Sequence, residues 1–119
     1  MFDFEKLEVY NEARSLNTLV FKSVILPQSG DAYLLDQLKR AQLSILLNIS
    51  EGTGRMTKPD KKRFYVMARS SVNEVVSILQ VMMDTGDLKG SVYDDIYQRA
   101  EKISKMLLGM IRSMTTHID

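Results

Sequence analysis

The sequence lacks cysteine and tryptophan, and it contains a single histidine, His117. The absence of cysteine excludes disulfide frameworks, thiolate zinc sites, iron–sulfur clusters and thiol nucleophiles. A single histidine also excludes most histidine-based metal clusters and most acid–base pairs. We therefore expect a protein that is not an enzyme and that binds no cofactor and no metal ion.

Charge of either sign is not in excess, because 16 Lys and Arg residues stand against 15 Asp and Glu residues, for a net charge of +1 over 119 residues. The chain as a whole is therefore not a polycation. No apolar run reaches the length of about 18 residues that a membrane-spanning helix needs. The first six residues lack the basic region and apolar core of a signal peptide. We expect a cytoplasmic protein with one domain over residues 1–119.

Proline and glycine are also scarce, with two and six residues, and all but Gly109 fall into three short breaks at residues 27–30, 52–59 and 86–90. The segments between the breaks are too long for ordinary strands and suit helices. Pro27 ends the first segment, Asp31 is placed to cap the second, Pro59 suits the first turn of the third, and Gly86 suits its end. The predicted helices span about 5–26, 32–52, 59–86 and 92–116.

Two helix starts are predicted from weaker signals. Asp3 is a candidate N-cap of the first helix, although Phe2 and Phe4 are also compatible with an extended arm. Ser91 and Asp94 have the spacing of a pair that caps the last helix.

Apolar residues recur at spacings of three and four in each predicted helix, which places them on one helical face. Because short connections make successive helices antiparallel neighbours, we predict an all-α, up-down-up-down antiparallel four-helix bundle. The predicted core faces are Val9, Ala13, Leu16, Val20 and Val24; Leu34, Leu38, Ala41 and Ile45; Phe64, Ala68, Ser71, Val75, Ile78 and Met82; and Ile96, Ala100, Ile103, Leu107, Met110 and Met114.

More apolar residues are present in the second and third helices than one core face requires. The segment 43–49 is apolar on nearly every side, and a helix of that kind is usually buried all round. A contiguous apolar patch outside the core typically marks an interface. We therefore predict a homo-oligomer whose interface contains Leu35, Leu43, Leu46, Leu47, Tyr65, Val72, Val76 and Met83.

Positive charge is concentrated between residues 55 and 69, where six cations and one acid, Asp60, give a local charge of +5 (six minus one). Cations in the first turn of a helix oppose its dipole, so local helix stability does not explain them. Such a cluster is able to contact phosphates, although many basic runs are only solvated surface. The candidate nucleic-acid-binding residues are Arg55, Lys58, Lys61, Lys62, Arg63 and Arg69.

Other chemistry is weakly supported. The turn at residues 52–55 has two glycines but no preceding strand and no Gly-Lys-Ser/Thr, so it does not match a phosphate-binding loop. No histidine lies three residues after a candidate core glutamate, as a di-iron site requires. We instead expect a structural polar network near the second break, formed by Asn48, Glu51, Ser71 and Glu74.

Four segments carry a resemblance to a known family. Residues 3–13 contain the pattern Phe-x-x-Leu-x-Val-aromatic-x-x-Ala, and residues 48–55 are Asn-Ile-Ser-Glu-Gly-Thr-Gly-Arg. Residues 68–74 and 105–111 complete the pattern. Together they resemble the four-helix-bundle proteins encoded in 23S ribosomal RNA intervening sequences, which are similar to the accessory variability determinant proteins of diversity-generating retroelements. The resemblance implies a cyclic pentamer and, for the retroelement branch, binding to a reverse transcriptase and to nucleic acid.

The sequence thus favours a non-enzymatic oligomeric bundle that binds structured RNA or a ribonucleoprotein through the basic residues, with DNA as another possible ligand. The alternative is an interaction scaffold, a ring-shaped adaptor for a partner protein such as a reverse transcriptase, with no direct nucleic-acid contact.

Overall fold

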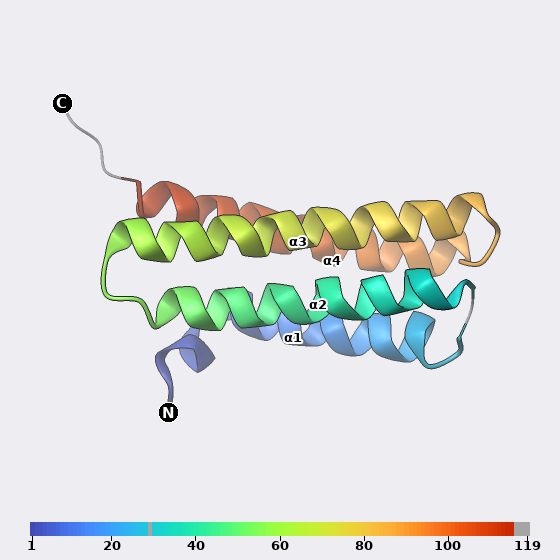
Figure 1. Ribbon diagram of the computed structural model, residues 1–119, viewed down its shortest axis with the longest axis horizontal. Coiled ribbons are helices and arrows are strands. Elements are labelled where there is room, and N and C mark those ends of the chain that lie inside the picture. Colours follow the sequence, from blue (N-terminus) through green and yellow to red (C-terminus); the bar gives the residue numbers. More distant parts are fainter. Residues whose placement is uncertain (29, 116–119) are drawn as a thin grey trace.

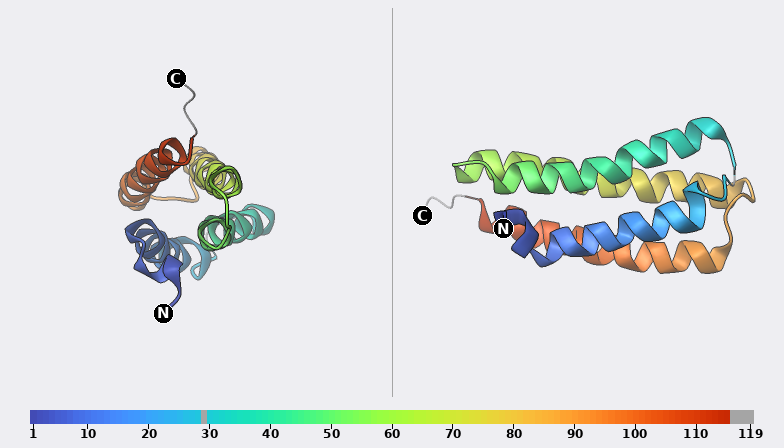
Figure 2. Two further views of the ribbon diagram at one scale, coloured as in Figure 1. Left: turned by 90° about the vertical axis from the view of Figure 1, so that its left-hand side faces the viewer. Right: turned by 90° about the horizontal axis from the view of Figure 1, so that it is seen from below.

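A computed structural model describes residues 1–28 and 30–115 of the protein. Within these residues four long antiparallel helices pack around one core, and no strand is present (Figures 1 and 2). The helices are α1 (Glu8–Val20, continued by the π-helical turn η2, Phe21–Ile25), α2 (Ala32–Thr53), α3 (Lys58–Asp84) and α4 (Gly90–Ser113). The predicted all-α four-helix architecture is confirmed. None of these helices is both long and apolar enough to cross a bilayer.

Three of the predicted helix ends are confirmed in atomic detail. The Asp31 carboxylate accepts hydrogen bonds from the backbone N–H groups of Tyr33 and Leu34, at 2.8 and 3.2 Å, and so caps α2. Pro59 lies in the first turn of α3, where its missing N–H removes no helical bond. Gly86 follows the end of α3 with φ of +80°, a conformation that glycine adopts without strain.

Two helix starts differ from the prediction. Asp3 does not cap α1, because residues Asp3–Lys6 form a separate 3₁₀ turn, η1, in which the Glu5 carboxylate accepts from the Phe2 N–H at 3.0 Å. α1 then starts at Glu8. Ser91 and Asp94 do not cap α4 either, because the chain turns back so tightly after Gly86 that α4 already begins at Gly90. The predicted end of the last helix at residue 116, and His117, lie outside the described residues.

The end of the first helix contains a π turn that the sequence did not reveal. The Leu26 N–H donates to the Phe21 carbonyl at 2.8 Å, a bond across five residues instead of four. The wider turn brings both Val24 and Ile25 into the core, where each is buried. The predicted core face of this helix is otherwise confirmed, since all five of its residues are buried.

The predicted core face of α3 is confirmed at four of its six residues, since Phe64, Ala68, Val75 and Met82 are buried, and it differs at the other two. Val72 and Leu79 are fully buried, whereas Ser71 and Ile78 are only half-buried. The reason is a hydrogen bond of 2.8 Å between the hydroxyls of Ser71 and Ser44, which sets Ser71 at the seam with α2 instead of in the centre. A similar shift in α2 buries Leu35 in place of Leu34.

One polar side chain lies in this otherwise apolar interior. Gln42 of α2 is 1% exposed, and neither its amide nitrogen nor its carbonyl oxygen bonds to any described protein group. A buried amide without a partner destabilises a fold by about 1–3 kcal/mol. Gln42 is therefore a weak point of the core.

Candidate nucleic-acid interface

The basic segment begins at the turn between α2 and α3, and tight packing of the two helices positions it. Gly52 is buried where α2 meets α3, and a Cβ atom there would lie 2.8 Å from the Cβ of Phe64. The hydroxyls of Thr53 and Tyr65 lie 3.0 Å apart and join the same two helices. The turn that follows, residues 54–57, is thus held at one end of the bundle.

Lys61 serves this turn structurally. Its ammonium group donates to the Thr53 carbonyl at 2.8 Å, and its side chain is half-buried. The acceptor is one of the last carbonyls of α2, where a positive charge also complements the helix dipole. Lys61 is therefore engaged by the protein itself, at the end of α2.

Two arginines cover one aromatic ring. The guanidinium carbons of Arg55 and Arg63 lie 4.5 and 4.7 Å from the centre of the Phe64 ring, within cation–π range. Both also approach carboxylates, Arg55 at 4.0 Å from Glu51 and Arg63 at 3.8 Å from Asp60. These long, exposed ion pairs contribute little to stability. The ring fixes where the two guanidinium groups lie and leaves them accessible.

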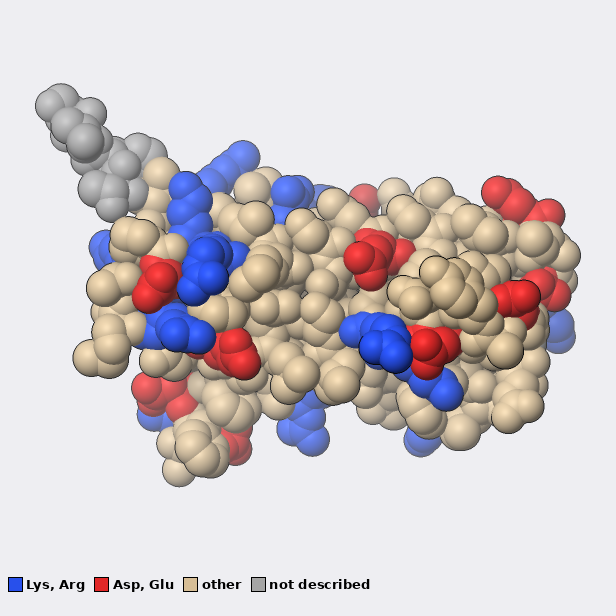
Figure 3. All heavy atoms as spheres, in the orientation of Figure 1, with Lys and Arg blue, Asp and Glu red and all other residues tan. Residues whose placement is uncertain are grey.

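The other three cations differ in their surroundings. Lys58 and Lys62 form no ion pair with any residue in the described ranges. Arg69 points away from the turn, because its Nε donates to the backbone carbonyl of Ser104 on α4 at 3.4 Å. The structure thus gathers Arg55, Lys58, Lys62 and Arg63 at one end of the bundle. On the face formed by α2 and α3, blue atoms gather at the end that carries the α2–α3 turn (Figure 3).

Comparison with known protein families identifies the family of the chain. The sequence profile of the 23S rRNA-intervening sequence protein family matches residues 5–109, which is most of the chain. The chain belongs to the 23S rRNA-intervening sequence protein family. Among curated proteins, no sequence matches it.

A solved structure supports the same fold for this family member. It is the crystal structure of a protein with unknown function from the S23 ribosomal protein family of Bacteroides thetaiotaomicron VPI-5482. The two chains share 21% sequence identity with a TM-score of 0.78, and the match covers 87% of this chain and 98% of that one. At this identity the likeness establishes the fold alone.

The predicted polar network of this family member exists only in part. The Asn48 amide donates to the carbonyl and hydroxyl of Ser44, at 2.9 and 3.0 Å, and Ser44 in turn bonds to Ser71. Glu51 lies outside this group and approaches only Arg55. Glu74 is exposed and bonds to no described residue. Ser44 is the member that the sequence did not indicate, because a serine beside an apolar stripe has no distinctive signal.

The predicted interface residues separate into three groups. Leu35, Tyr65 and Val72 are buried inside the chain itself, so the prediction that they lie outside the core is wrong. Each directly follows a residue assigned to the core (Leu34, Phe64 and Ser71), because the buried face of each helix is wider than the predicted stripe. Leu46 and Val76 are partly buried against the core, and Met83 is half-buried. Leu43 and Leu47 are exposed.

Leu43 and Leu47 form the exposed part of an apolar face on this chain. They are 54% and 52% exposed, and Met67 of α3, at 38%, adds to them across the seam that Ser44 and Ser71 bridge. Figure 3 shows a broad uncharged area between two groups of charged residues on this side. Met67 was not among the predicted interface residues.

In the part of the chain that the structure describes, no three His, Asp or Glu residues are placed to hold a metal ion.

Proposed function

We propose that this protein is a non-enzymatic, oligomeric helical bundle of the cytoplasm that binds structured RNA through the end of the bundle bearing the α2–α3 turn. The observation that supports this most directly is the gathering of Arg55, Lys58, Lys62 and Arg63 on a chain whose net charge is only +1. The family name, 23S rRNA-intervening sequence protein, agrees with an association with RNA.

The electrostatics of the turn favour a ligand outside the protein. Lys58 lies in the first turn of α3, where a positive charge opposes the helix dipole, and Lys62 follows at the start of the second turn. Neither is offset by an ion pair within the described residues. A phosphate oxygen would relieve this repulsion, and an arginine fork is able to bind phosphate in a bidentate manner.

The test compares two charge-reversed variants with the same total charge. Lys58→Glu/Lys62→Glu alters the proposed interface, and Lys22→Glu/Lys39→Glu alters exposed lysines at the opposite end of the bundle. We expect the first variant to bind a short hairpin RNA about tenfold more weakly or worse, with a shallower dependence of affinity on salt. The second should stay near wild type. Equal losses in both variants, or binding that is independent of salt, would refute the proposed interface.

The oligomeric state is the second part of this proposal. Leu43, Leu47 and Met67 form an exposed apolar face next to the basic end, and such faces typically pair with another protein surface. A cyclic assembly, with a pentamer as the expected form, would repeat the basic end around a ring. Native mass spectrometry should show this oligomer for the wild type and a monomer for Leu43→Glu/Leu47→Glu, while Leu26→Glu, at another exposed leucine, should assemble normally. A wild-type protein that is monomeric at micromolar concentration would overturn this part.

The same apolar face supports one alternative function. A scaffold for a partner protein, such as a reverse transcriptase, would use the face around Leu47 and need no contact with nucleic acid. In a pull-down, a partner that stays bound after nuclease treatment and at high salt, and that is lost in Leu43→Glu/Leu47→Glu, favours the scaffold. A partner that is released by nuclease favours RNA binding.

A further inference from the structure

A groove of about 320 Å³ lies between α3 and α4, away from the α2–α3 seam. Its α3 side includes Asn73, Val76 and Gln80, and its α4 side includes Tyr97, Glu101 and Ser104. The volume is at the lower end of the range for small-molecule sites, about 300–1,000 Å³. The groove therefore suits a single ring system of modest size.

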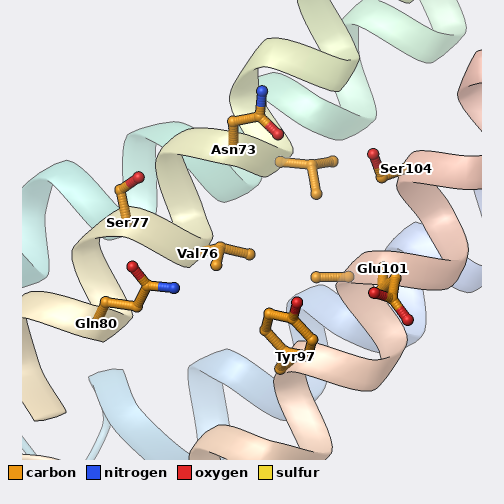
Figure 4. Close-up of a pocket in the computed structure, with 9 residues that line it drawn as sticks. Asn73, Val76, Ser77, Gln80, Tyr97, Glu101 and Ser104 are labelled. Carbon is orange, nitrogen blue, oxygen red and sulfur yellow. The ribbon is translucent and has the colours of Figure 1, made fainter.

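Flat apolar surfaces line the middle of this groove. Figure 4 shows Val76 and Tyr97 directed from opposite helices toward the space between them. Tyr97 is 40% exposed, so one part of its ring is open to solvent. The ring of Tyr93 lies close to that of Tyr97, with 5.7 Å between the ring centres and an interplanar angle of 37°. Tyr97 supplies the aromatic ring of the groove lining, and an aromatic ligand in the groove is able to pack against it.

Amide groups lie beside this stacking surface. The Gln80 nitrogen Nε2 donates to the Tyr93 hydroxyl at 3.1 Å, and Figure 4 shows this nitrogen, not the carbonyl oxygen, on the side of Gln80 that faces the groove. Asn73 forms no side-chain hydrogen bond with a described residue. Asn and Gln amides pair with the amino and ring nitrogens of adenine. Because an amide carries both a donor and an acceptor, Asn73 is able to pair with the edge of a base.

A carboxylate completes the polar lining. Glu101 lies at the α4 edge of the groove (Figure 4), and its Oε1 is 3.6 Å from Lys105. A carboxylate accepts hydrogen bonds from an amino group such as that of cytosine, and it repels a phosphate. The groove itself is thus unsuited to a phosphate and suited to a base.

The groove continues the basic surface along α3. Arg69 bonds to the backbone of Ser104, a groove residue, and so lies at the end of the groove. Lys62, Arg69, Asn73, Val76 and Gln80 follow at spacings of 7, 4, 3 and 4 residues, which places them along one face of the helix. Val76 lies seven positions after Arg69 in the helix, which is about 10 Å along its axis. A strand whose phosphates contact Lys62 and Arg69 would therefore bring a neighbouring base to the groove.

We propose that this groove binds an unpaired nucleobase with an exocyclic amino group (adenine, cytosine or guanine, but not uracil), stacked on Tyr97. The inference rests on the proposed function for its phosphate contacts, because the same nucleic acid lies on the basic end of the bundle. It adds a site of base recognition that the basic residues cannot supply, since phosphate contacts carry no sequence information.

The first test uses single-stranded oligonucleotides and three variants. Tyr97→Ala should weaken binding of oligo(A) about 5- to 100-fold, as loss of one stacked base does elsewhere. Tyr97→Phe should restore it, because the ring remains, and Tyr33→Ala, at an exposed tyrosine of α2, should have no effect. Oligo(dA) should behave like oligo(A), because stacking does not depend on the sugar, whereas oligo(U) should bind less tightly to the wild type. The salt dependence should be unchanged in Tyr97→Ala.

The second test separates this inference from the proposed function. Adenosine and cytidine, which have no phosphate, should shift the NMR signals of residues that line the groove at millimolar concentration, and uridine should shift them less. If oligo(A) binds with normal salt dependence but Tyr97→Ala binds it equally well, the base site is refuted and the basic interface stands. If Lys58→Glu/Lys62→Glu leaves RNA affinity unchanged but adenosine still shifts the groove signals, the basic interface is refuted and base recognition stands.

Discussion

Replacing Gly52 by alanine tests how closely α2 and α3 approach each other below the basic turn. The added Cβ would lie 2.8 Å from Phe64 Cβ and 2.9 Å from Tyr65 Cε1. Phe64 Cβ is bonded directly to the α3 backbone, so a rotamer change cannot remove the clash and the helices must separate. Overpacking of this kind destabilises by about 1–3 kcal/mol.

A smaller opposing effect comes from helix propensity. Alanine is favoured over glycine by up to about 1 kcal/mol within a helix, and Gly52 lies in the last turn of α2, where the gain is lower. The expected result is a net loss of about 1–2 kcal/mol for Gly52→Ala. At this chain length that corresponds to a midpoint of thermal unfolding lower by about 4–8 °C.

Gly109 supplies the matched control. It lies within α4, and no atom is within 4 Å of the position that its Cβ would occupy. Gly109→Ala should therefore stabilise the protein by about 1 kcal/mol. Both variants are measured by circular dichroism at one protein concentration, because the unfolding of any oligomer depends on concentration. If Gly52→Ala unfolds at or above the wild-type temperature, the close approach does not constrain the bundle and the reasoning fails.

Three further substitutions make separate predictions of stability. Asp31→Ala removes the N-cap of α2 and should destabilise by about 1 kcal/mol in urea unfolding, whereas Asp31→Asn should retain most of the stability. Gln42→Met keeps the length of the side chain but removes two buried, unpaired polar atoms, so we expect a gain of about 1–3 kcal/mol; a loss would mean that Gln42 has a partner in solution. Ser71→Ala should cost about 0.5–1.5 kcal/mol, and a double-mutant cycle with Ser44→Ala should give less than the sum of the single losses.

The succession of helices was predictable because its signals are local. Pro27, Asp31, Pro59 and Gly86 act on their own backbone or on groups within a few residues, so their effect does not depend on distant parts of the chain. The starts at Glu8 and Gly90 were not predicted. At these positions a 3₁₀ turn and a tight connection replaced the expected side-chain caps.

The candidate site was predicted as a set of residue types but not as a geometry. The sequence indicated six cations, yet it did not indicate that Lys61 caps α2 or that Arg69 reaches α4. Both contacts join residues on different helices, and no spacing along the chain encodes them. The groove beside Tyr97 is likewise built from two helices whose facing residues lie about 20–30 positions apart.

The sequence by itself determined that four amphipathic helices form and roughly where each one ends, because hydrophobic periodicity and capping are properties of short segments. The tertiary structure decided which residues beside each predicted apolar stripe are buried. Successive residues differ by about 100° around a helix, so several adjacent stripes are similarly apolar in α2 and α3. Packing against the neighbouring helices, together with the Ser44–Ser71 hydrogen bond, selected Leu35, Val72 and Leu79 for the core and left Leu43 and Leu47 exposed.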